Sequence, residues 1–277
     1  MELLSYPFFR NALLGVMLIS VAAALVGTYI VTRRMVFISG GLTHACFGGL
    51  GLGYFMGWPP MATAAVFAVG SALGVEWLSR RRVREDSAIA VVWALGMALG
   101  ILFVFMSSGY VPELNAFLFG NVLTITPSDL WLFADFTALL GLLYICFYRV
   151  IVAVSFDENF ARVLRLPVRA VNIIMTVFVA VAIVLTIRMI GIMLLMSLLS
   201  LPQMTAETFT RRYMPMLVWS AVISLAGGVA GLVFSYYISV PASAAIVLVL
   251  VAIYAVALIV ARCLRLRRRA AARRLPE

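Results

Sequence analysis

Few residues in this 277-residue chain have side chains that could bind or transfer a chemical group. His44 is its one histidine, and it follows the run Ser-Gly-Gly-Leu-Thr at 39–43. A neutral imidazole can coordinate a soft or borderline divalent cation. On sequence spacing alone, a lone histidine is more often a structural residue that hydrogen-bonds to a neighbouring helix, so both interpretations stay open.

Carboxylates inside apolar stretches are the second kind of candidate, because an unpaired charge is costly in a bilayer. Asp135 lies within a long apolar run, where it could line a hydrated path for a cation. We expect instead that it pairs with Arg188 or with a hydroxyl side chain. The three cysteines form no CxxC pair, so we expect inert core thiols and no metal ligands.

All 21 basic residues are arginine, and the lack of lysine excludes two kinds of chemistry. A P-loop needs its lysine to reach nucleotide phosphates, and Schiff-base catalysis needs a lysine amine. A chain of this composition that uses ATP must rely on another chain to bind it. We therefore expect no enzymatic activity and no resident cofactor here.

The composition requires a membrane. The chain is 65% hydrophobic and 12% charged, whereas soluble proteins have roughly 45–50% apolar and about 25% charged residues. At about 20 residues per span, we predict an all-α, polytopic integral membrane protein with eight or nine helices in one transmembrane domain, 1–277. The nine candidate spans are 11–32, 40–57, 60–78, 88–107, 129–149, 170–187, 189–204, 215–236 and 242–262.

The distribution of arginine predicts the orientation, because short cytoplasmic loops carry the excess of positive charge. With nine spans, all arginines except Arg10 and Arg188 fall on one side. This places the N-terminus outside and the C-terminus in the cytoplasm, where the basic tail 262–277 would bind anionic lipid and not nucleic acid. Merging the two short spans around Arg188 gives eight spans and moves the N-terminus inside.

Two segments stand out from the apolar background. The second span is rich in glycine, and Gly49 and Gly53 form a small-xxx-small pair that predicts close packing of helix backbones. The segment 155–169 is amphipathic: apolar residues recur at 156, 160, 163 and 164 with helical spacing, and Pro167 ends the pattern. Such a helix could lie on lipid or dock into a groove of a partner protein.

Four motifs resemble those of the zinc/manganese-type ABC transporter permeases. Residues 33–45 are similar to that family's RRMAFFGDALSHA element, and residues 156–168 to its D-E-x-F-A-x-x-L-G-L-P-V element. Residues 187–206 and 236–243 are similar to two further family segments. The order and spacing of the motifs match over nearly the whole chain.

The resemblance implies a permease of the bacterial cytoplasmic membrane that forms a homodimer and imports Zn²⁺ or Mn²⁺ as its substrate. Its expected partners are a cytoplasmic ATP-binding subunit, an extracytoplasmic solute-binding protein and membrane lipid. It also makes 156–167 the helix that couples the permease to the ATPase. The residues expected to form that contact are Phe156, Asp157, Glu158, Phe160, Ala161, Arg162, Leu164 and Pro167.

The expected metal residues are His44 and Asp135, and one departure from the family pattern affects them. The family's aspartate is replaced here by Gly40, whereas the histidine is retained as His44. Three alternatives remain for the whole chain. The first is an ATPase-independent secondary transporter or channel for a small cation, and the second is an ABC permease for iron or a siderophore. The third is a membrane scaffold that binds no substrate.

Overall fold

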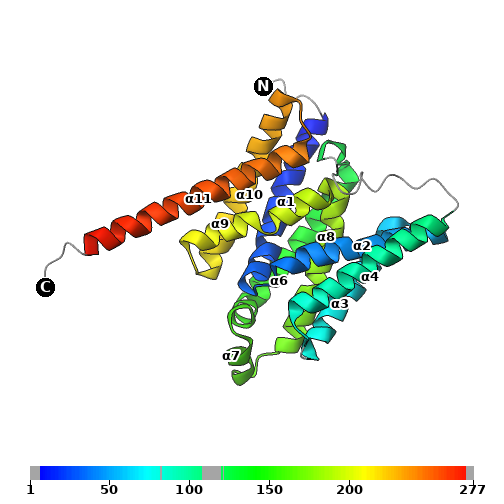
Figure 1. Cartoon of the computed structure of the whole chain (residues 1–277), viewed down its shortest axis with the longest axis horizontal. Coiled ribbons are helices and arrows are strands. Elements are labelled where there is room, and N and C mark those ends of the chain that lie inside the picture. Colours follow the sequence, from blue (N-terminus) through cyan, green and yellow to red (C-terminus); the bar gives the residue numbers. More distant parts are fainter. Residues whose placement is uncertain (1–6, 82, 108–119, 121, 273–277) are drawn as a thin grey trace.

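The computed structural model describes residues 7–81, 83–107, 120 and 122–272 (Figure 1). Within these residues the chain is helical and has no strand, because backbone groups in a bilayer must be satisfied without water. The elements are α1 (Pro7–Thr32), α2 (Val36–Met56), α3 (Pro60–Arg80), α4 (Glu85–Met106), the 3-10 turn η2 (Val122–Thr124), α6 (Pro127–Phe156), α7 (Glu158–Val163), α8 (Val168–Leu198), α9 (Leu201–Phe209), α10 (Tyr213–Ile238) and α11 (Ala242–Ala272).

Eight helical segments of the described chain are long and apolar enough to cross a membrane, which confirms the predicted all-α polytopic fold. Seven of them are single helices. The other is a 42-residue segment, Val168–Phe209, that contains both α8 and α9. The predictions of eight and of nine spans differ only in whether this segment counts as one span or as two.

The segment Val168–Phe209 is bent back on itself at Gly191. The backbone there (φ 78°, ψ 174°) is not helical and lies in a region that favours glycine. Arg188, just before the break, pairs with Asp129 at the start of α6. The predicted spans 170–187 and 189–204 therefore correspond to the two arms of this bent segment. The predicted boundary at Arg188 is wrong, because Arg188 lies inside the helix and the chain breaks at Gly191.

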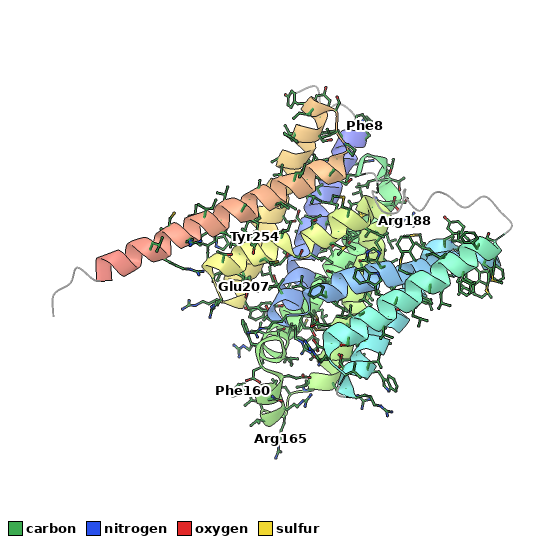
Figure 2. All side chains as sticks on the ribbon, in the orientation of Figure 1. Phe8, Phe160, Arg165, Arg188, Glu207 and Tyr254 are labelled. Atoms are coloured by element: carbon green, nitrogen blue, oxygen red, sulfur yellow. The ribbon has the colours of Figure 1, made fainter. Side chains whose placement is uncertain are left out.

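One end of the molecule, which we call the arginine face, collects basic side chains from many elements. It is defined by Arg33, Arg80, Arg162, Arg169 and Arg211, which line two adjoining cavities. Figure 2 shows Phe160 and Arg165 at this end, whereas Phe8 and Arg188 lie toward the other. Both ends of the bent segment Val168–Phe209 reach the arginine face, through Asn172 and Glu207.

The glycines of α2 let it pack directly on the backbones of α3 and α4, as the sequence predicts. A Cβ atom added at Gly49 would lie 2.5 Å from the carbonyl oxygen of Thr63 in α3. A Cβ added at Gly51 would lie 2.5 Å from the carbonyl oxygen of Gly100 in α4. Helices α2, α3 and α4 therefore form a tightly joined group, visible beside α8 in Figure 1.

Two further predictions concern the termini and loops. α11 continues to Ala272, so the first part of the basic tail extends the last helix beyond the predicted end at 262. Cys46 is buried as expected, but Cys146 and Cys263 are exposed on α6 and α11, so they are not core residues.

Candidate functional site

The predicted amphipathic helix is α7, which lies on the arginine face between α6 and α8 (Figure 1). Asp157 caps it, because its Oδ1 accepts a 2.9 Å hydrogen bond from the backbone N–H of Phe160. The extended backbone of Asp157 also separates α7 from α6. The helix is consequently shorter than the predicted 156–167: Phe156 belongs to α6, and Pro167 precedes α8.

The end of α7 is closed by a left-handed residue. The N–H of Leu166 donates to the carbonyl oxygen of Ala161 (3.0 Å), and the N–H of Arg165 donates to that of Arg162 (2.9 Å). This pattern needs a residue with positive φ, and Arg165 adopts φ 56°. Arg165 occupies the position where the family element described above has glycine.

Apolar side chains are exposed on α7 and at both of its ends. We call Phe156 (the last residue of α6), Phe160, Val163 and Leu164 (directly after α7) the apolar cap; their exposed fractions are 54%, 57%, 79% and 53%. Ala161, on the opposite side of the helix, is fully buried and anchors α7 to the bundle. An exposed apolar patch with charged neighbours is typical of a surface that binds another protein or a membrane.

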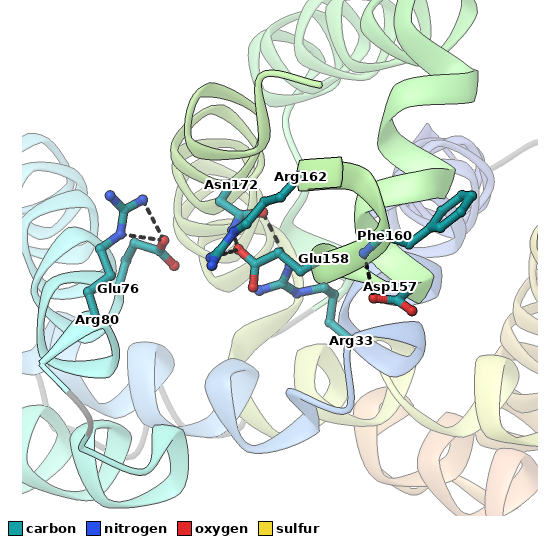
Figure 3. A network of polar contacts seen from close by, with 8 residues as sticks. All are labelled: Arg33, Glu76, Arg80, Asp157, Glu158, Phe160, Arg162 and Asn172. Carbon is teal, nitrogen blue, oxygen red and sulfur yellow. Dashed lines mark hydrogen bonds and ion pairs between the residues drawn. The ribbon is translucent and has the colours of Figure 1, made fainter. Parts of the chain in front are cut away.

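A chain of polar contacts ties α7 to the rest of the arginine face (Figure 3). Arg162 pairs with Glu158 at 3.1 Å, and Asn172 donates a 2.8 Å hydrogen bond to the same carboxylate. Arg33, in the turn between α1 and α2, donates to Asn172 at 3.2 Å. The sequence analysis did not select Asn172; the signal that could have found it is an amide in the first turns of an otherwise apolar helix.

The two adjoining cavities give the arginine face an open, charged interior. Their volumes are about 690 and 510 Å³, and Arg33, Glu85 and Glu158 line both of them. Glu207, from the returning arm of the bent segment, lines the larger one. Carboxylates and arginines therefore line both cavities together.

His44 lies on the side of α2 that faces α4. Its ring stacks on the indole of Trp93, with centroids 4.6 Å apart and planes 5° apart. Its Nδ1 is buried and has no hydrogen-bond partner among the described residues. At the position of the family's aspartate, a Cβ on Gly40 would lie 2.8 Å from the Cε of Met196. A methionine thioether therefore fills the space that the aspartate would need.

Asp135 lies on the exposed surface of α6 and forms no ion pair with the described residues. The predicted pairing of Asp135 with Arg188 is wrong, because Arg188 pairs with Asp129 at 2.8 Å. Asp135 and His44 are not brought together either, because their helices do not pack on each other: α2 packs mainly on α3, α4 and α8, whereas α6 packs on α1, α7 and α8. In the part of the chain that the structure describes, no three histidine, cysteine or acidic residues form a group that could hold a metal ion.

Long apolar helices, one of them bent back on itself, and a short capped helix at one end define a polytopic membrane transport subunit. The model of the ABC 3 transport family matches residues 5–261, so the chain belongs to this family. This membership does not favour the alternatives of a scaffold or of an ATPase-independent channel.

Named relatives agree with this assignment. The chain is 35% identical to an uncharacterised membrane protein of Synechocystis over 93% of its length and 92% of the relative. It is 30% identical to a manganese transport system membrane protein of Halalkalibacterium halodurans, covering 92% and 88% of the two chains. The structure of PsaBC from Streptococcus pneumoniae in complex with Fab matches with a TM-score of 0.81 and 25% identity, covering 92% of each chain.

Proposed function

We propose that this chain is the permease subunit of an ABC importer that moves a divalent metal ion across the bacterial cytoplasmic membrane. A separate cytoplasmic subunit hydrolyses ATP, and an extracytoplasmic solute-binding protein delivers the ion. Mn²⁺ is the first candidate, because a relative that is 30% identical is named as a manganese transport protein. Zn²⁺ is the second, on the resemblance of the motifs.

The apolar cap of α7 is the observation that carries this proposal. A soluble partner would bury Phe160, Leu164 and their neighbours. Removing these apolar side chains from water would stabilise the complex. The capped and anchored helix holds this patch in a fixed position. In this function, α7 is the site where the ATPase pushes on the permease.

The path for the ion is proposed to involve His44 and Asp135 in a homodimer. Asp135 is an exposed carboxylate on an apolar helix, and facing lipid without a partner would be costly. A second copy of the chain, or a hydrated path between two copies, would remove that cost. Since each chain offers one histidine, two copies provide two imidazoles for one ion, and a transient path needs few ligands.

The test is to co-express the chain with its ATPase subunit and to introduce Phe160→Asp. A charge in the apolar cap should abolish co-purification of the ATPase while membrane insertion is unchanged. Trp58→Asp, at an exposed aromatic residue after α2, is the matched control and should leave the complex intact. Normal complex formation by the Phe160 variant would overturn the role of α7.

The cargo is tested with the reconstituted wild-type complex and its binding protein. ATP hydrolysis and uptake are measured with Mn²⁺, Zn²⁺ and Fe²⁺ in turn. We expect stimulation by Mn²⁺ or Zn²⁺, and stimulation by Fe²⁺ alone would contradict the proposed substrate.

A further inference from the structure

We infer that Asn172 is the joint through which α7 moves the turn between α1 and α2, and with it the helix that carries His44. This inference rests on the proposed role of α7 as the contact with the ATPase. It assigns Asn172 and Arg33 as positioning residues, which act through α7 and α2 and touch neither ATP nor the metal ion.

The geometry places one buried amide between two elements. The side chain of Asn172 is only 2% exposed, at the start of α8. Its Oδ1 accepts a hydrogen bond from the Nη1 of Arg33 at 3.2 Å, and its Nδ2 donates to the Oε1 of Glu158 at 2.8 Å (Figure 3). Both outer partners carry a full charge, which makes the two hydrogen bonds stronger than neutral ones.

An amide is suited to this position because it accepts on one side and donates on the other. A carboxylate would still accept from Arg33 but would repel Glu158. α7 itself packs on α6 and α8, and α6 packs on α1. The polar chain through Asn172 is the direct hydrogen-bonded connection from α7 to the turn that contains Arg33.

Movement of that turn is passed on to α2. Arg34 has φ 59° and Met35 directly precedes α2, so the turn is tight. A displacement of Arg33 is therefore expected to move the start of α2 with it. Further along α2, a Cβ at Gly48 or Gly51 would contact the backbone of α4, so the two helices are joined closely. A displacement of Glu158 therefore reaches the α2–α4 pair where His44 stacks on Trp93.

The experiment exchanges the hydrogen-bond donor and acceptor between positions 172 and 158. It uses the complex with the ATPase subunit, reconstituted in liposomes. Asn172→Asp should leave the ATPase bound and hydrolysing ATP, but metal moved per ATP should fall about tenfold, as expected for losing one charge-assisted hydrogen bond. Adding Glu158→Gln should restore most of the transport, because the introduced amide can donate to the introduced carboxylate. Glu158→Gln alone is measured beside it, because Glu158 is itself expected to take part in the ATPase contact and pairs with Arg162. The matched control is Asn11→Asp, which removes a 3.2 Å hydrogen bond to the carbonyl oxygen of Ile125 at the other end of the molecule. It should leave the metal moved per ATP unchanged.

A second measurement needs no cargo. Spin labels at Val163→Cys and Phe37→Cys, with Cys146 and Cys263 replaced by serine, report the distance between α7 and the start of α2. We expect a narrow distance distribution for the parent, a broad one with Asn172→Asp, and a narrow one again in the double variant.

The two readouts separate the joint from the proposed function. The inferred role of Asn172 is contradicted if the distance distribution stays narrow with Asn172→Asp. It is also contradicted if the double variant moves no more metal per ATP than Asn172→Asp alone. If the distances respond as expected but no metal is moved by the parent complex, the cargo assignment fails while the joint is supported.

Discussion

His44 and Asp135 are the two polar residues that the sequence selects inside the apolar region, and the fold holds them on helices that do not pack together. His44 keeps an unpartnered Nδ1 beside a stacked indole, whereas Asp135 lies on the outer surface of α6. Residue type was enough to choose them. Their separation depends on which helices pack together, and the sequence pattern does not contain that information.

We expect His44→Ala to reduce metal uptake strongly without lowering expression, because the buried Nδ1 of His44 bonds to no described residue, so the imidazole is not held by a structural hydrogen bond through that atom. Uptake of Mn²⁺ by cells or proteoliposomes, at matched protein levels, is the measurement. Cys46→Ala, a buried change on the same helix, is the control. Unchanged uptake by the histidine variant would leave His44 with a purely structural role.

Arg165 adopts a left-handed conformation that costs a side-chain-bearing residue roughly 1–2 kcal/mol. Arg165→Gly should therefore raise the melting temperature of the detergent-solubilised protein, with a gain of about 1 kcal/mol. Arg162→Gly, inside α7, should lower it, because glycine is a poor helix former and the ion pair with Glu158 is lost. A lower melting temperature for the Arg165 variant would show that its side chain contributes more than the turn costs.

At the scale of the elements, the hydrophobic runs predict most of the fold. The apolar periodicity at 156–164 found α7, but its bounds depended on the cap by Asp157 and on the turn at Arg165. The sequence predicts a break at Arg188, because a charged residue interrupts the hydrophobic run. The helix breaks at Gly191 instead, and one glycine among many does not mark a break in the sequence. Asn172 was missed for a similar reason: its importance comes from two partners that are distant in sequence.

The glycines of α2 make a prediction about packing. Gly51→Val should destabilise the protein by about 3 kcal/mol or more, because a Cβ there meets the backbone of Gly100 and neither helix can yield easily. Gly70→Val is the matched control, since a Cβ at Gly70 meets nothing within 4 Å. Thermal unfolding and size-exclusion profiles in detergent compare the two, and equal behaviour would contradict the close packing of α2 on α4.

At the scale of the whole molecule, the arginine face predicts the orientation in the membrane. α7 and the cavities should face the cytoplasm, and the turn at Trp58 should face outward. In a background with Cys146 and Cys263 replaced by serine, a membrane-impermeant thiol reagent should label Trp58→Cys in intact cells. It should label Val163→Cys only after lysis, and the reverse pattern would invert the orientation.

The bend at Gly191 also has a consequence for biogenesis. With the arginine face in the cytoplasm, as predicted above, Val168–Phe209 begins and ends on the side of synthesis and would enter the bilayer as a helical hairpin. Arg188 is the one charged side chain that this hairpin must carry across. Asp129, delivered earlier by α6, is already in position to neutralise it on arrival.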